Sequence, residues 1–216
     1  MQTEVAIPLA SGGEVAATLG GEPGSPMVVF AHGSGSSRHS RRNRQVAAVL
    51  EAGGMQTLLL DLLTEPEERV DLVTREHRFD IELLTNRLIE ATHWVEKREP
   101  GSIIGLFGAS TGAAAALRAA AHRPESIAAV VSRGGRTDLA GPDLERVDAA
   151  VLLIVGGDDP EVLRLNLDSL THLNGRSDLT LIAGATHLFE EPGKLEEVAD
   201  LALDWFRRHL GDAHRR

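Results

Sequence analysis

The segment Gly108–Gly112 most constrains the fold of this chain, because it joins a short apolar run to an alanine-rich one. The run Ser102–Phe107 is typical of a buried strand, and Ala113–Ala121 is expected to be helical. A strand that turns directly into a helix holds Ser110 in a strained backbone with positive φ. Glycines two residues to either side remove side chains that would collide there. This G-x-S-x-G spacing indicates a nucleophilic serine.

Strand-like and helix-like segments alternate along the rest of the 216 residues. We expect strands at Thr3–Leu9, Glu14–Leu19, Met27–Ala31, Met55–Leu60, Ser102–Phe107, Ser126–Val131, Ala150–Val155 and Leu179–Ile182. We expect helices at Asn43–Ala52, Phe79–Arg98, Thr111–His122, Val162–Leu173 and Leu195–Leu210. The pattern predicts an α/β fold, a doubly wound, mostly parallel sheet with helices on both faces, in a single domain over residues 1–216.

Composition excludes several classes of chemistry. With no cysteine and no tyrosine, the chain has no disulfide, no thiolate nucleophile or metal site, and no tyrosine acid. A net charge of −10 disfavours nucleic acid as a partner. The N-terminal residues lack a signal-peptide pattern, and no apolar run has membrane-spanning length. We therefore expect a cytoplasmic protein with no membrane partner; a homodimer stays open.

A serine nucleophile needs an imidazole base, and that base needs a carboxylate. Functional groups of open α/β sheets gather beyond the carboxyl ends of the strands, where Ser110, an aspartate pair and His187 all fall. We expect His187 to be the base and Asp159 the acid, because Asp159 stands just before a helix. Asp158 stays open as the alternative acid.

Attack by a serine on an ester would form a tetrahedral oxyanion, and two backbone N–H groups are expected to stabilise it. Thr111, at the start of a helix, would give one donor, and Ser34 of the His32-Gly33-Ser34 loop the other. Further candidates for substrate contact are His32, Gly33, Arg133 and Phe189. Four arginines after this loop could select an anionic substrate, although a solvated helix entrance is the simpler interpretation: Arg38, Arg41, Arg42 and Arg44.

Together these segments resemble the α/β-hydrolase superfamily, in its dienelactone-hydrolase-like branch. The matching pieces are Ala31–Ser37, Gly105–Gly112, Leu153–Asp159 and Gly184–His187. The resemblance implies an eight-stranded sheet with one antiparallel strand near its start, and hydrolysis of carboxylic esters or lactones without a cofactor or metal. Dienelactone hydrolases proper use a cysteine nucleophile, whereas this chain has Ser110, so lactone specificity does not carry over.

Two connections bear on substrate access. Ser132–Asp148 has room for one short helix, so we expect a minimal lid or none, an open pocket and a small-molecule ester as substrate. Leu62–Arg78 is expected to be a flap or a solvated loop. Alternatives to a hydrolase are an acyltransferase or perhydrolase with the same triad, and a catalytically silent binding protein. The spacing of Gly105, Gly108 and Gly112 could be taken for a dinucleotide-binding loop. A nicotinamide oxidoreductase is disfavoured, because these three glycines follow an interior strand and do not open the first βαβ unit.

Overall fold

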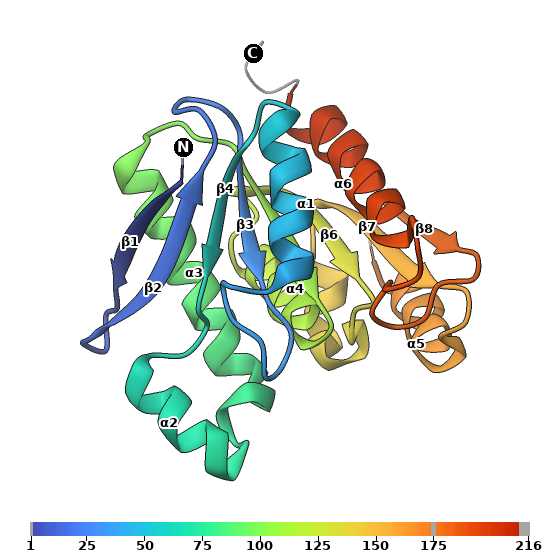
Figure 1. The fold of residues 1–216 in the computed structure, drawn as a ribbon, viewed down its shortest axis with the longest axis horizontal. Coiled ribbons are helices and arrows are strands. Elements are labelled where there is room, and N and C mark those ends of the chain that lie inside the picture. The colour runs from blue at the N-terminus through green and yellow to red at the C-terminus, as the bar shows by residue number, and fades with distance from the viewer. Residues whose placement is uncertain (1, 174–175, 212–216) are drawn as a thin grey trace.

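The fold is built on one eight-stranded sheet (Figure 1). The computed structural model describes residues 2–173 and 176–211; residues 1 and 212–216 of the expected domain lie outside them. The strands, in the spatial order β1-β2-β4-β3-β5-β6-β7-β8, are β1 (Thr3–Pro8), β2 (Glu14–Gly20), β3 (Met27–Ala31), β4 (Gln56–Leu60), β5 (Ile104–Ala109), β6 (Ile127–Arg133), β7 (Ala150–Gly156) and β8 (Ser177–Ile182). In the part of the chain that the structure describes, β2 alone runs opposite to the other strands. It pairs antiparallel with β1 and β4 and the remaining pairings are parallel, which confirms the predicted sheet.

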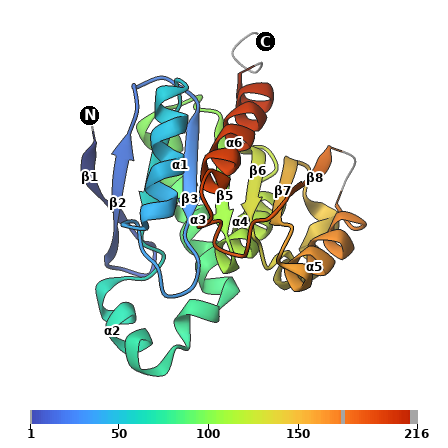
Figure 2. The ribbon, with the colours of Figure 1, turned by 45° about the vertical axis from the view of Figure 1, so that its right-hand side comes forward.

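Helices cover both faces of the sheet (Figures 1 and 2). They are α1 (Arg41–Ala52), α2 (Glu65–Thr74), α3 (Ile81–Arg98), α4 (Thr111–His122), α5 (Pro160–Leu170) and α6 (Lys194–Leu210), with the 3-10 segments η1 (His77–Phe79) and η2 (Thr137–Arg146). Helices α1 and α6 pack on one face, and α3 and α4 on the other.

The continuously apolar strands follow from this two-sided cover. In β3, Val28 and Phe30 pack toward α1 and α6, whereas Met27, Val29 and Ala31 pack toward α3 and α4. Successive side chains of a strand point to opposite faces, so a strand covered on both sides has no face toward solvent and is mostly apolar. The expected interior strand is confirmed.

The connection between β4 and α3 is not the expected solvated loop, because half of it is the helix α2. Thr64 caps the helix by accepting from the Glu67 N–H, and Glu67 accepts in return from the Thr64 N–H at 2.7 Å. Helix α2 projects from the carboxyl edge of the sheet in both views (Figures 1 and 2). The short connection expected at 132–148 holds only η2.

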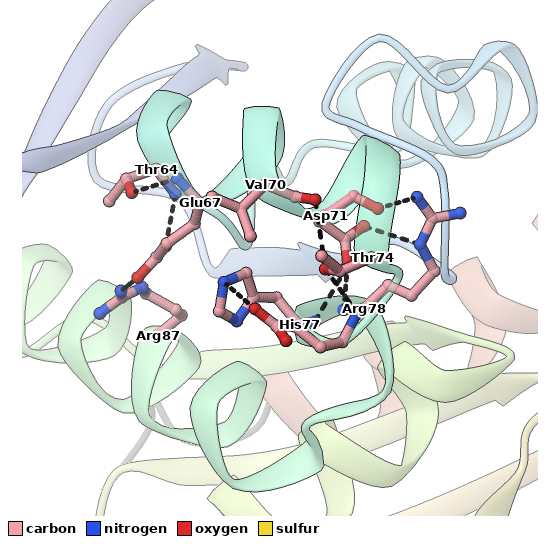
Figure 3. A network of polar contacts seen from close by, with 9 residues as sticks. Thr64, Glu67, Val70, Asp71, Thr74, His77, Arg78 and Arg87 are labelled. Carbon is pink, nitrogen blue, oxygen red and sulfur yellow. Dashed lines mark hydrogen bonds and ion pairs between the residues drawn. The ribbon is translucent and has the colours of Figure 1, made fainter.

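An ion pair fastens the end of α2 to the chain that follows it (Figure 3). Asp71 is 3% exposed and accepts from Arg78 Nε at 2.7 Å and from the backbone N–H groups of His77 and Arg78 at 2.9 Å each. Burial raises the pKa of Asp71, but its hydrogen bonds with Arg78 and His77 and the charge of Arg78 outweigh burial and lower it overall. The projecting segment is therefore held by polar contacts.

Candidate active site

Ser110 occupies a strained turn between β5 and α4, with φ 52° and ψ −121°. A Cβ on Gly108 would lie 2.4 Å from Ala113 Cα, and one on Gly112 would lie 2.4 Å from the Ala31 carbonyl oxygen. Both contacts are too short for any side chain, so these two glycines allow strand, turn and helix to pack this closely. The turn expected from the sequence is present.

Backbone hydrogen bonds fix this turn from the neighbouring strand. The Ser110 N–H donates to the Arg133 carbonyl at 3.2 Å, and the Ser110 carbonyl accepts from the N–H groups of Ala113 at 3.1 Å and Arg136 at 3.0 Å. The Ser110 side chain is half-buried. Main-chain contacts on both sides thus set the position of Ser110.

Asp159, and not Asp158, contacts His187. Asp159 Oδ2 lies 2.7 Å from His187 Nδ1, while its other oxygen accepts from the Val162 N–H at 3.5 Å and caps α5. Asp158 is exposed, and its N–H donates to the Ala185 carbonyl at 2.9 Å. A carboxylate on Nδ1 places the proton on that nitrogen and leaves Nε2 free to accept one.

The His187 loop is packed against its neighbours. A Cβ on Gly156 would lie 2.3 Å from the Ala185 carbonyl, so β7 and this loop approach closely. Two residues after His187, Phe189 adopts φ 56° and is 1% exposed. Its side chain packs in the apolar layer under α1 and α6, and the cleft wall next to His187 is Leu188. Phe189 therefore anchors the loop.

Ser110 and His187 line one cleft of about 240 Å³ at the carboxyl edge of the sheet. The other lining residues are Gly33, Ser34, Ser36, Ser40, Arg42, Ala109, Arg133 and Leu188. No hydrogen bond joins Ser110 Oγ to His187 in the part of the chain that the structure describes.

The His32 loop is braced against β4. His32 Nε2 accepts from the Leu62 N–H at 3.2 Å, and Nδ1 lies 2.9 Å from the Gly33 carbonyl. Burial lowers the pKa of His32, which keeps the imidazole neutral and suited to both contacts. A Cβ on Gly33 would come within 3.2 Å of Ser110 Cβ, so this loop passes directly beside the serine. His32 lies outside the Ser110 cleft and orients the loop.

The two expected oxyanion donors flank Ser110. Thr111 is the first residue of α4 and is 3% exposed, and Ser34 is exposed on the cleft. A helix N-terminus presents N–H groups without intrahelical partners, so α4 points its positive end at the serine.

The four arginines that follow the His32 loop in the sequence have different surroundings in the structure. Arg38 pairs with Asp61 and Glu4, and Arg41 and Arg44 are exposed, but Arg42 lines the cleft. Arg133 lines it too and is 7% exposed. Sequence reasoning missed Gly134, whose positive φ of 52° lets the backbone pass beside the His187 ring; only its glycine identity after a strand end was a signal.

Comparison with models of protein families found no match. Over 186 residues, 85% of this chain, the sequence is 58% identical to a curated protein of Mycobacterium tuberculosis H37Rv named "Putative phosphoribosyl transferase"; the match spans 41% of that protein. The chain therefore spans about two fifths of the length of such curated relatives. Among the described residues, no helix is long and apolar enough to cross a membrane.

The likeness to solved structures covers more of this chain, and more of the matched proteins, than the likeness to the curated relatives does. The crystal structure of dienelactone hydrolase from Anabaena variabilis is 50% identical, covers 97% of this chain and 98% of its own, and has a TM-score of 0.94. Est1E from Butyrivibrio proteoclasticus, at 15% identity and a TM-score of 0.79, covers 95% of this chain and 98% of its own and shows the fold alone. The chain belongs to the dienelactone-hydrolase-like branch of the α/β-hydrolases.

Proposed function

We propose that this chain is a serine hydrolase that cleaves small carboxylic esters or lactones through an acyl-enzyme. The observation that carries the proposal is the 2.7 Å contact between Asp159 and His187, made in the loop that lines the same cleft as Ser110. The Anabaena relative, named a dienelactone hydrolase, supports hydrolysis as the reaction class.

In this mechanism His187 Nε2 takes the proton of Ser110 as Oγ attacks the ester carbonyl carbon. The carbonyl oxygen becomes an oxyanion, stabilised by the N–H groups of Thr111 and Ser34. Collapse breaks the ester bond, and His187 returns the proton to the departing alcohol. Water, deprotonated by His187, then releases the acid and regenerates Ser110. Asp159 stabilises the imidazolium in both halves.

Acyl transfer and perhydrolysis share this acyl-enzyme and differ only in the second nucleophile, an alcohol or a peroxide instead of water. The open cleft admits each of them. Product analysis after incubation of an activated ester with water alone, with added alcohol or with peroxide separates the three reactions.

The test is turnover of p-nitrophenyl acetate by wild type, Ser110→Ala and His187→Ala. We expect each variant to lose on the order of 10⁴-fold in kcat/KM while keeping the wild-type melting temperature. A near-normal rate in either variant would contradict the triad. A folded wild type that turns over no activated ester would favour a silent binding protein.

A further inference from the structure

The cleft beside Ser110 contains a buried arginine with an unused donor. Arg133 is paired in register with Ala109, the residue before Ser110, and it is 7% exposed. Its Nη2 lies 3.4 Å from Asn43 Oδ1, a neutral acceptor, and its Nη1 is buried with no hydrogen-bond partner among the described residues. Burying a cation without a carboxylate is costly, so a structure retains it only where something compensates.

A second arginine reaches the same cleft from the first turn of α1. Arg42 Nη1 pairs with Glu190 Oε1 at 2.6 Å, but the Glu190 side chain is 62% exposed and lies outside the cleft lining. Arg42 Nε is buried and, within residues 2–173 and 176–211, has no partner. The residues that line the cleft include two arginines and no carboxylate.

The helices that begin at this cleft add to its positive potential. Acidic residues occupy the first turns of α2, α3, α5 and α6, as the helix dipole favours, whereas α1 and α4 have none. Helix α4 begins beside Ser110, and α1 begins at Ser40, which also lines the cleft. Both helices that lack an acidic first turn begin at this cleft, whereas α5, which begins at Asp159 beside His187, carries Glu161 in its first turn.

We propose that Arg133 and Arg42 form an anion-binding subsite beside Ser110, separate from the N–H donors expected for the tetrahedral intermediate. The anion that it binds is a phosphate group carried by the ester substrate. This inference rests on the proposed function and narrows its substrate class. Two guanidinium groups and two helix N-termini match a dianion better than a single carboxylate. The hydroxyls of Ser34 and Ser36 also line the cleft and add donors for a group with three free oxygens.

Burial and, to a smaller extent, the charge of Arg42 together lower the pKa of Arg133 to about 10. Arg133 is therefore still a cation at neutral pH. No carboxylate contributes to stabilising its charge, which agrees with a subsite whose counter-ion arrives with the substrate.

The first experiment measures competitive inhibition of p-nitrophenyl acetate turnover by inorganic phosphate and by glutarate. We expect phosphate to compete, and glutarate to bind at least 5-fold more weakly. Arg133→Gln is expected to weaken phosphate inhibition at least 10-fold, and Arg42→Gln to weaken it in the same direction. Arg44→Gln is the matched control, because it removes one charge from the same helix at an exposed position; its inhibition constant should stay within 2-fold of wild type.

The second experiment does not depend on turnover: calorimetric titration of inorganic phosphate into Ser110→Ala, with and without Arg133→Gln. Loss of binding in the double variant supports the subsite even if the proposed hydrolysis fails. If Arg133→Gln does not fold, Arg42→Gln in the same background gives the test. Equal phosphate binding by these variants and Arg44→Gln would overturn the subsite, and tighter binding of glutarate would overturn the assignment to phosphate; either result would leave ester hydrolysis standing.

Discussion

Two clefts lie on opposite sides of the His32 loop and share Gly33, Ser34 and Ser36. The Ser110 cleft holds Arg42 and Arg133, with unpartnered buried nitrogens among the described residues. The second, which we call the α2 cleft, is lined by Asp61, Leu62, Asp71, Leu72 and Arg78 together with the loop. The arginine of the α2 cleft has a carboxylate partner, because Arg78 Nε lies 2.7 Å from Asp71 Oδ2.

The difference in pairing between the two clefts distinguishes charged residues that stabilise the fold from charged residues that we propose to bind a ligand. In the α2 cleft Asp71 accepts from the N–H groups of His77 and Arg78 and from Arg78 Nε, so the ion pair holds α2 in place. In the Ser110 cleft, the proposed nucleophile Ser110 lies in a strained turn, and two guanidinium groups have buried nitrogens without partners among the described residues. Functional sites commonly retain such locally unfavourable features.

The largest effect we expect lies on the Ser110 side. Asp159→Asn keeps the shape of the acid but not its charge, so kcat/KM should fall on the order of 10⁴-fold, about 5 kcal/mol, with little change in stability. Asp158→Asn is the matched control at the neighbouring, exposed position and should stay within about 3-fold of wild type, since surface changes away from the site have small effects. Ester turnover and thermal unfolding of both variants check this; comparable losses in the two would contradict the assignment of the acid.

A smaller effect, on stability, is expected in the α2 cleft. Asp71→Ala leaves Arg78 Nε and two backbone N–H groups without their acceptor, so the free energy of unfolding should fall by about 2–4 kcal/mol. The control is Glu65→Ala, which breaks the exposed pair with Arg69 and should cost less than about 1 kcal/mol. Denaturant unfolding measures both, and equal values would show that the Asp71 network does not hold α2.

The same pair predicts a pH dependence. The folded pKa of Asp71 is depressed, so its stabilisation is fully present above the ordinary aspartate pKa and is lost as pH falls toward the folded pKa. Unfolding of wild type should therefore become easier with acid below about pH 4, more steeply than unfolding of Asp71→Ala. Parallel pH profiles for the two proteins would contradict this linkage.

The smallest expected effect compares the two clefts through the sign of the change in the free energy of unfolding when each loses an arginine. Arg78→Met should destabilise the protein, because it leaves Asp71 buried without its cation. Arg133→Met should stabilise it by about 1 kcal/mol, because it removes a buried charge that has no carboxylate partner in the described chain. Denaturant unfolding of the two variants decides, and destabilisation by both would show that Arg133 is structural.

The sequence predicted the positions of the strands and the strained turn at Ser110 well, because both depend on local patterns. Continuous apolar runs mark strands buried on both faces, and glycines at fixed offsets mark the Ser110 turn. Helix starts were less accurate: α5 begins at Pro160, two residues before the expected Val162, because Asp159 caps it. The cap was visible as Asp-Pro, a common way to open a helix.

Helix α2 was missed because hydrophobic periodicity does not reveal it. Its apolar residues Val70, Leu72 and Val73 are 44%, 69% and 85% exposed, so no buried stripe marks the helix. The signal that could have found it is the capping box Thr64-x-x-Glu67 with Pro66 near the start. The different surroundings of the arginines could not be read from sequence, since Arg38 and Arg42 are only four residues apart. Arg38 pairs with Asp61 and Glu4, whereas Arg42 pairs with Glu190 and keeps a buried Nε that has no partner among the described residues.

The most direct test of the account is reaction of the folded protein with a fluorophosphonate probe, followed by mass-spectrometric mapping of the adduct. The account predicts one adduct per chain at Ser110, with loss of p-nitrophenyl acetate turnover in proportion to labelling, and no adduct in His187→Ala over the same time. A folded wild type that stays unlabelled, or an adduct at another residue, would contradict the claim that Ser110 is an activated nucleophile.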